Sequence, residues 1–252
     1  DYLSKDFTVI IPDLRGFGNS SYNNEFNTLL ELAEDLNLLL KHLKITETAV
    51  LGWSMGGGVA LELATTYPNL VNKLILLSSA SIKGYPVFKK DEKGQVLFPE
   101  IYNKKSDMAL DIVQVLPLLN AQKTQDINLM KQIFDLVIYT GNKKPNDEDN
   151  TRWLNDALKQ RNLVDVDWAL ANFNISNEPS PYSQGNNKIA NLKADTLIIW
   201  GDKDLTVPKI MFDENVKGIK NNESIVYEGA GHSIIAEEPE KLAKDINNFI
   251  LK

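Results

Sequence analysis

One serine of the sequence stands inside a run of glycines, in the stretch LGWSMGGG from Leu51 to Gly58. Gly52, Ser54 and Gly56 fit the pattern G-x-S-x-G, and the residues just before it are apolar. In that context the pattern predicts a sharp turn between a strand and a helix, with space only for glycine at its flanks. The turn would expose the Ser54 hydroxyl at the end of a sheet, so Ser54 is a candidate nucleophile.

The helix predicted after Ser54 would contribute to the same chemistry. Amides in the first turn of a helix have no intrahelical partner and carry partial positive charge, so the Met55 N–H can donate to an oxyanion. A different interpretation is a glycine-rich turn that binds a phosphate group. Neither G-x-x-x-x-G-K-[ST] nor G-x-G-x-x-G follows the strand, which favours a nucleophile over a phosphate site.

A serine hydroxyl needs a base within hydrogen-bond reach to act as a nucleophile. The sequence has two histidines. His42 lies beside Lys41 near the end of an amphipathic stretch, which predicts a solvated residue at a helix end. His232 follows the last predicted strand, and catalytic groups of parallel sheets gather at such strand ends. His232 is therefore the candidate base.

An imidazole that moves protons is usually oriented by a buried carboxylate. The run GDKDLTVP, residues 201–208, offers Asp202 and Asp204 directly after another predicted strand. The alternative is that both aspartates only cap the helix that follows this run. Ser54, one of these aspartates and His232 come in the order Ser, Asp, His, each after a strand, which indicates a catalytic triad.

The elements that must position these residues are short apolar strands alternating with amphipathic helices. This alternation predicts a mostly parallel sheet flanked by helices, with strands buried on both faces. The predicted strands are FTVII (7–11), TAVLGW (48–53), KLILLSS (73–79), TLIIWG (196–201) and SIVYEG (224–229). The predicted helices cover residues 27–43, 59–67 and 238–252.

Residues 81–188 differ from the parts on either side, because they contain several helical stretches and no comparable strand. The clearest helical stretches are residues 106–121, 126–141 and 147–161. We expect residues 1–80 and 189–252 to form one α/β core, and residues 81–188 to form a helical cap inserted into it.

The composition argues against several functional classes. A formal net charge of −7 without a basic cluster disfavours nucleic acid or an anionic membrane surface as a partner. The absence of cysteine excludes a disulfide framework and a thiolate metal site, and no apolar run is long enough to span a bilayer. No metal or organic cofactor is implied. We expect a cytoplasmic protein, although any signal peptide would lie before Asp1, where the sequence begins.

These stretches together resemble the α/β-hydrolase fold superfamily, and most of all its cap-bearing serine esterase and lipase-like branch. The resemblance is carried by PDLRGFGNS (12–20), LGWSMGGG (51–58), ATTYPNLVNKLILLSS (64–79), IIWGDKDLTVP (198–208) and GAGHSIIAEEPEKL (229–242). It implies an α/β-hydrolase fold with a nucleophile elbow at Ser54. It also selects Asp204 over Asp202, because the acid of the family is the last residue of a G-x-x-D turn, and so implies a triad of Ser54, Asp204 and His232.

Residues around the triad have weaker assignments. Asp13 and Arg15 match a family segment that shapes a loop near the active site, and we interpret them as structural, with Ser20 in the same turn. Trp53, beside the nucleophile, either lines the substrate pocket or supports its strand. The aromatic residues of the cap could contact substrate or form the core of the cap: Tyr85, Phe88, Phe98, Tyr102, Trp153, Trp168, Phe173 and Tyr182.

The sequence departs from the family at its beginning. Family members have an upstream strand that ends in His-Gly, and the loop after it supplies a second N–H to the oxyanion hole, but no such element precedes FTVII. The absent strand would lie between FTVII and TAVLGW. A gap there would leave two rows of backbone groups unpaired, at about 1 to 3 kcal/mol for each buried group. We therefore predict that an N-terminal segment of a longer polypeptide, or a second chain, completes the sheet.

The resemblance implies a hydrolase that acts on carboxylic esters or lactones of small to medium size through an acyl-enzyme on Ser54. Two alternatives remain open. One is a serine enzyme of the same fold with another reaction, either a carbon–carbon bond hydrolase or a cofactor-free perhydrolase. The other is a ligand-sensing module that retains the triad, turns over slowly and signals to a protein partner.

Overall fold

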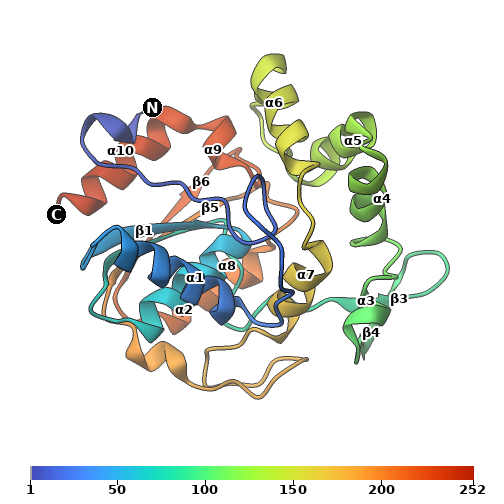
Figure 1. Ribbon diagram of the computed structural model, residues 1–252, viewed down its shortest axis with the longest axis horizontal. Helices are drawn as coiled ribbons and strands as arrows, with labels where there is room; N and C mark the ends of the chain where they lie inside the picture. Colours follow the sequence, from blue (N-terminus) through green and yellow to red (C-terminus); the bar gives the residue numbers. More distant parts are fainter. Residues whose placement is uncertain (1) are drawn as a thin grey trace.

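The computed structural model describes residues 2–252, and its centre is a four-stranded sheet (Figure 1). All neighbouring strands are parallel, in the order β1-β2-β5-β6. The strands are β1 Thr48–Trp53, β2 Val71–Leu77, β5 Asp195–Gly201 and β6 Asn222–Tyr227. Four of the five predicted strands thus form the sheet, with ends within two residues of the prediction.

Helices cover both faces of this sheet, as its continuous apolar strands require. Residues on β2 alternate between the two layers: Leu74 and Leu76 pack with α1, α2 and α8, whereas Ile75 and Leu77 pack with α9 and α10. Figure 1 shows the two helical layers on opposite sides of the strands. The helices are α1 Leu29–His42, α2 Met55–Thr66, α8 Lys209–Gly218, α9 Ile234–Glu237 and α10 Pro239–Ile250.

The prediction of a strand at FTVII is wrong. Residues 8–14 have no strand or helix assignment, although a short 3-10 helix, η1 Leu3–Lys5, precedes them. Val9, Ile10 and Ile11 are exposed, Ile11 to 89%. A strand exists only where a neighbour accepts and donates its backbone hydrogen bonds, and β1 is paired only with β2 within residues 2–252. The apolar pattern of residues 7–11 is therefore not sufficient to make a strand here.

The segment between β2 and β5 contains five helices and a β-hairpin. The helices are α3 Lys105–Met108, α4 Leu116–Thr124, α5 Ile127–Val137, α6 Asp147–Ala157 and α7 Leu163–Asn172, and a 3-10 turn, η2 Lys188–Asn191, follows them. The hairpin, β3 Phe88–Lys90 and β4 Val96–Ile101, was not expected in a segment predicted to be helical. Its turn is fixed by Asp91 Oδ1, which accepts the N–H groups of Lys93 and Gln95 at 2.9 Å.

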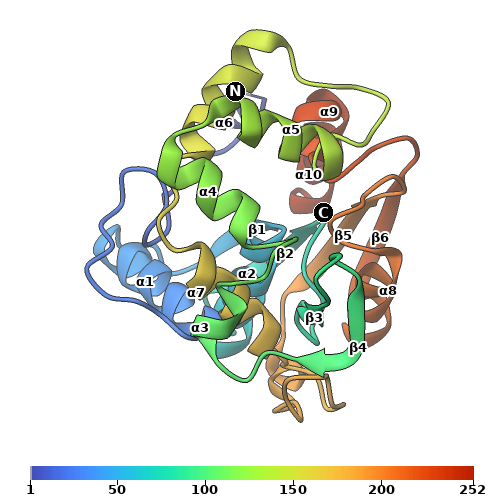
Figure 2. The same ribbon diagram turned by 90° about the vertical axis from the view of Figure 1, so that its right-hand side faces the viewer.

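This segment, residues 81–188, is called the insertion below. Figure 2 views the molecule from the side where the hairpin, α4 and α5 lie in front of the sheet. The last helix of the insertion is not separate from the core, because Val166, Ala169 and Leu170 of α7 belong to the same buried cluster as α1 and α2. Within residues 2–252, no helix has the combined length and apolar character needed to span a membrane.

Candidate active site

Ser54 is the single residue between β1 and α2. Its backbone has φ 55° and ψ −122°, a conformation that residues with a Cβ rarely adopt. The turn is held by hydrogen bonds beyond itself, since the Ser54 N–H donates to Leu77 O (3.0 Å) and Ser54 O accepts from the Ala80 N–H (3.1 Å). The end of β2 and the chain that leaves it therefore fix this strained conformation.

Close packing at the turn requires glycine at two positions, of which only one belongs to the pattern. A Cβ on Gly52 would overlap Gly56 O, and a Cβ on Gly57 would overlap the Ser79 hydroxyl. A Cβ on Gly56 would have no neighbouring atom within 4 Å. The prediction that space restricts both flanks of Ser54 to glycine is thus right at Gly52 and wrong at Gly56.

The amide of Met55 lies in the first turn of α2, directly after Ser54. Amides at this position have no acceptor within the helix, and the helix dipole adds positive potential there. Met55 is partly exposed and packs against the core cluster that contains α1 and α2. The arrangement leaves its N–H available to an anion that forms beside the Ser54 hydroxyl.

Asp204 follows β5 and His232 follows β6, so two neighbouring parallel strands bring them together. His232 Nδ1 lies 2.9 Å from Asp204 Oδ2, and the two residues are only 1% and 5% exposed. Asp204 Oδ1 accepts the N–H groups of Thr206 and Val207, both at 2.8 Å. With one oxygen occupied in this way, the carboxylate presents the other to Nδ1. In the tautomer that carries its proton on Nδ1 and donates it to Oδ2, Nε2 is free to accept a proton.

Asp202 has a different role from Asp204. It is exposed, and its Oδ1 accepts the Gly229 N–H at 2.6 Å, which links the loop after β5 to the loop after β6. The alternative in which both aspartates only cap the next helix is wrong. The N-cap of α8 is Pro208, and no side chain caps that helix.

Trp53 contacts the backbone and the ring of His232. Its Nε1–H donates to His232 O at 3.0 Å, and the indole and imidazole centroids lie 5.3 Å apart with a tilt of 37°. The sequence left open whether Trp53 lines a pocket or supports its strand. Its observed contact is with the residue predicted to be the base.

The Ser54 hydroxyl and the His232 imidazole are linked through Trp53 but are not hydrogen-bonded to each other. Ser54 directly follows Trp53, which touches His232. Among the hydrogen bonds of residues 2–252, none joins Ser54 Oγ to His232. Catalytic hydrogen bonds are often long or poorly aligned without substrate and shorten in the reacting complex.

Other residues assigned from the sequence, namely His42, Asp13, Arg15 and Ser20, have partners or surroundings other than His232. His42 is exposed at the end of α1, as expected for a solvated helix end. Arg15 donates to both carboxylate oxygens of Asp35, at 2.9 and 2.8 Å. The Ser20 hydroxyl donates to Asp13 O at 2.7 Å, so these two residues do share one turn.

Two residues of the insertion, Tyr85 and Asp167, have raised pKa values. Tyr85 is one of the aromatic residues predicted either to contact substrate or to form the core of the cap, whereas Asp167 was not assigned from the sequence. The Tyr85 hydroxyl donates to Thr206 O at 2.8 Å, and burial, with the charges of Asp167 and Asp204, raises the pKa of Tyr85 to about 12. Burial also raises the pKa of Asp167 on α7 to about 7. The only sequence signal for Asp167 is its place among apolar residues in the helical stretch LVDVDWALAN.

Glu237, on α9, is a further buried polar residue that was not assigned from the sequence. It is 3% exposed, and its Oε2 accepts the Gly231 N–H at 2.6 Å. Burial and the charges of Asp204 and Glu238 raise the pKa of Glu237, while N–H groups of Gly231 and Gly141 act in the opposite direction. Glu237 therefore contacts the residue immediately before His232.

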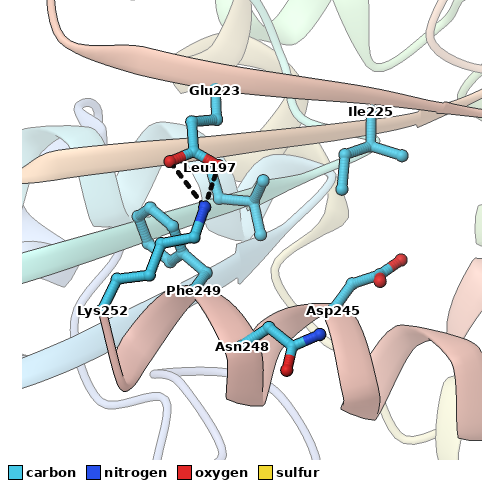
Figure 3. Close-up of a pocket in the computed structure, with 7 residues that line it drawn as sticks. All are labelled: Leu197, Glu223, Ile225, Asp245, Asn248, Phe249 and Lys252. Carbon is cyan, nitrogen blue, oxygen red and sulfur yellow. Dashed lines mark hydrogen bonds and ion pairs between the residues drawn. The ribbon is translucent and has the colours of Figure 1, made fainter.

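A groove elsewhere on the surface is not part of this site (Figure 3). It lies between the sheet and α10, where the Lys252 ammonium contacts both carboxylate oxygens of Glu223 at 2.8 and 2.6 Å. Leu197 of β5 and Glu223 of β6 are paired in register near the starts of their strands. Asp204 and His232 follow the opposite ends of these strands. No group of three or more His, Asp or Glu within residues 2–252 could hold a metal ion.

A family model described as "alpha/beta hydrolase fold" matches residues 1–239. The chain belongs to the α/β hydrolase family. Its parallel sheet, flanked by helices, is the fold of that family. Among curated relatives, this α/β hydrolase is 28% identical to the AB hydrolase superfamily protein YisY of Bacillus subtilis over 247 residues, which cover 97% of this chain and 82% of that protein.

Solved structures with the same fold include enzymes of more than one kind. An esterase from Exiguobacterium antarcticum, EaEST, is similar with a TM-score of 0.66 and 21% identity over 95% of this chain and 80% of its own. The 2-hydroxy-6-oxo-6-phenylhexa-2,4-dienoate hydrolase of Rhodococcus sp. strain RHA1 is similar with a TM-score of 0.70 and 18% identity over 100% of this chain and 82% of its own. At these identities the similarity establishes the fold.

Proposed function

We propose that this α/β hydrolase is a serine enzyme that cleaves carboxylic esters or lactones of small to medium size through an acyl-enzyme on Ser54. The observation that supports this most is the buried pair of Asp204 and His232 at 2.9 Å, beside the strained turn that carries Ser54. A fixed carboxylate, an imidazole beside it and a partly exposed serine at a strand end are the groups that acyl transfer needs.

The first half of the reaction forms the acyl-enzyme. His232 Nε2 accepts the proton of the Ser54 hydroxyl as Oγ bonds to the ester carbonyl carbon, and the Met55 N–H donates to the oxyanion. The carbon–alkoxide bond then breaks, and the alcohol leaves with the proton from Nε2. Throughout, Asp204 accepts the hydrogen bond from Nδ1–H and stabilises the imidazolium.

The second half releases the acid. A water molecule gives a proton to His232 Nε2 and attacks the acyl carbon, and the bond to Ser54 Oγ breaks as that proton passes to Oγ. A lactone follows the same steps, except that its alcohol stays attached to the acyl group. Only Ser54 and His232 need to change their covalent or protonation state, while Asp204 remains a carboxylate.

The proposal also includes a further strand on the free side of β1, with a second N–H donor for the oxyanion. β1 is paired on one side only, and residues 7–11 carry exposed apolar side chains instead of joining the sheet. A strand beside β1, from a longer polypeptide or a second chain, would satisfy that edge and could place a second N–H at the oxyanion. Addition of such a strand should then raise the rate of Ser54 labelling.

Fluorophosphonate labelling is the experiment that tests the proposed chemistry. The reagent phosphonylates a serine only where a base and oxyanion donors are assembled, so mass spectrometry should find the adduct on Ser54. His232→Gln should abolish the adduct, whereas His42→Gln should leave it unchanged. A labelled serine other than Ser54, or no labelling of the protein at all, would contradict the proposal.

A second candidate function is hydrolysis of a carbon–carbon bond in a ring-cleavage diketone. It is favoured by the TM-score of 0.70 with the Rhodococcus hydrolase, which is named for such a substrate. Assays that compare p-nitrophenyl esters with a 2-hydroxy-6-oxo-dienoate separate the two reactions. A higher kcat/KM for the dienoate would replace the ester as the substrate class while keeping Ser54, Asp204 and His232 in place.

A further inference from the structure

The chain between α5 and α6 contacts both loops that carry the acid and the histidine. We call residues 137–143 the bridge segment, residues 202–207 the acid loop and residues 228–233 the histidine loop. All three lie within the described residues, and the bridge segment is part of the insertion. Its contacts with the two loops are made mostly through the backbone.

The bridge segment is joined to the acid loop at two points. The Thr206 hydroxyl donates to Val137 O at 2.8 Å, and the Thr140 hydroxyl donates to Lys203 O at 2.5 Å. Thr206 is also one of the two residues whose N–H groups hold Asp204. The orientation of the carboxylate is therefore coupled to the position of the bridge segment.

The bridge segment is also joined to the histidine loop at two points. The His232 N–H donates to Ile138 O at 3.2 Å, and the Asn142 N–H donates to Gly229 O at 2.7 Å. Trp53 holds the carbonyl of His232 from the other side. The backbone of His232 is thus fixed at its N–H by the insertion and at its C=O by the turn that carries Ser54.

The carboxylate of Glu237 contacts both the histidine loop and the bridge segment. Glu237 Oε2 accepts the N–H of Gly231, in the histidine loop, at 2.6 Å, and the same oxygen packs against Gly141, in the bridge segment, whose backbone N–H lowers the pKa of Glu237. The fit is close, because a Cβ on Gly141 would overlap Oε2. Glu237 Oε1 is buried and has no hydrogen-bond partner within residues 2–252. A single oxygen therefore joins the histidine loop to the bridge segment.

Burial of the Glu237 carboxylate costs free energy of folding, so this residue needs partners that offset the cost. The burial of Glu237 and the nearby carboxylates of Asp204 and Glu238 all disfavour its charged form. Lys143 contacts Glu238, and no cation contacts Glu237 within residues 2–252. The two backbone N–H groups are the partners that compensate this cost, and one of them belongs to the residue before His232.

We propose that Glu237 is a positioning residue for His232. By joining Gly231 to Gly141, it holds the histidine loop against the bridge segment so that the imidazole stays aligned with Ser54. This role rests on the proposed function, in which His232 is the base. Glu237 does not contact the reacting atoms. It acts only through the backbones of Gly231 and Gly141.

Two substitutions at Glu237 test the role. Glu237→Gln keeps an oxygen acceptor for both N–H groups, so kcat should stay within about threefold of the wild type. Glu237→Ala removes the acceptor, and kcat for an aryl ester should fall about 10- to 100-fold, because a misplacement near 1 Å costs up to that much. KM should change less than twofold in both variants, since Glu237 does not touch substrate.

Glu62→Ala is the matched control for the loss of a buried carboxylate. Glu62 is 7% exposed on α2 and pairs with Lys188, outside the three segments. Its loss should destabilise the protein without changing kcat. If Glu237→Gln loses as much activity as Glu237→Ala, or if Glu237→Ala keeps the wild-type kcat, the positioning role is overturned.

A second variant acts from the other side of the contact. Gly141→Ala would push its Cβ against Glu237 Oε2, and it should reproduce the selective loss of kcat even if Glu237→Ala does not fold. A folded Gly141→Ala protein with unchanged kcat would overturn the role. The ¹H–¹⁵N shifts of Gly141 and Gly231 provide a readout independent of catalysis, and both should move in Glu237→Ala. If these amides move while Ser54 is unreactive in the wild type, the proposed function fails and the contact stands.

Discussion

The indole N–H of Trp53 donates to the backbone oxygen of His232 at 3.0 Å, and the two rings lie 5.3 Å apart. Trp53 is the last residue of β1, and Ser54 follows it. The loop of the candidate base is therefore attached to the strand that carries the candidate nucleophile. This contact explains how residues 54 and 232 are brought near each other without a direct hydrogen bond.

Trp53→Phe should lower kcat about tenfold and change KM less. Phenylalanine keeps a ring beside the imidazole but leaves His232 O without its donor, and an unsatisfied buried carbonyl costs about 1 to 3 kcal/mol. Steady-state kinetics with an aryl ester measures the change. Tyr2→Phe, which removes an exposed aromatic donor to Glu240, is the control and should leave kcat unchanged. An effect of Trp53→Phe on KM alone would instead favour a pocket-lining role.

Ser54→Ala should lower kcat by about a millionfold, as when a triad nucleophile is removed. The reason is the loss of the atom that bonds to the acyl carbon, so substrate binding should persist. Ester turnover and the thermal midpoint should be measured together, with Ser106→Ala as a surface control. A Ser54→Ala protein that keeps its esterase rate would exclude an acyl-enzyme on Ser54.

Asp204→Asn should lower kcat by about 10⁴-fold, because an amide in this position favours the wrong imidazole tautomer. Asp202→Asn is a matched control in the same loop. An asparagine oxygen at residue 202 can still accept the Gly229 N–H, so that variant should keep a rate within about threefold of the wild type. Equal losses in the two variants would contradict the assignment of Asp204 as the partner of His232.

The four strands of the sheet could be predicted because each contains a short apolar run. Only β2 and β5 are buried along most of their length, whereas β1 and β6 lie at the edges of the sheet, where Leu51 and Val226 are exposed. The same reasoning failed at residues 7–11, where the apolar pattern is equally strong. A strand also needs a partner, and local sequence does not contain that information. The β3–β4 hairpin was not predicted because its local sequence signal is weak. β3 is only three residues long, and the turn depends on the side chain of Asp91.

The residues of the candidate site that lie just after strands could be predicted from the sequence. Ser54 directly follows β1, and Asp204 and His232 lie in the loops that follow β5 and β6. Parallel strands place such residues at one edge of a sheet. The contacts of the bridge segment with His232 could not be predicted in this way. They use the backbone oxygen of Ile138 and the backbone N–H of Gly141, which leave no signature in side-chain type or spacing.

Asp167→Asn should stabilise the protein more at pH 8 than at pH 5. Burial raises the pKa of Asp167 to about 7, Asp111 adds to this rise, and Gln114 and Lys90 oppose it. Its Oδ2 has no hydrogen-bond partner within residues 2–252, so the charged form is poorly solvated. The folded protein therefore binds a proton that the unfolded chain, with a pKa near 3.8, releases.

The sign of the effect follows from this difference. Stability from the protonated Asp167 is fully present below about pH 4 and is lost as the pH rises through about 7, with a difference on the order of 4 kcal/mol. Asparagine is neutral throughout, so its advantage should grow between pH 5 and pH 8. Urea unfolding at both pH values measures it, with Asp156→Asn, an exposed carboxylate on α6, as the control. Equal shifts at pH 5 and pH 8 would mean that Asp167 ionises normally in the folded protein.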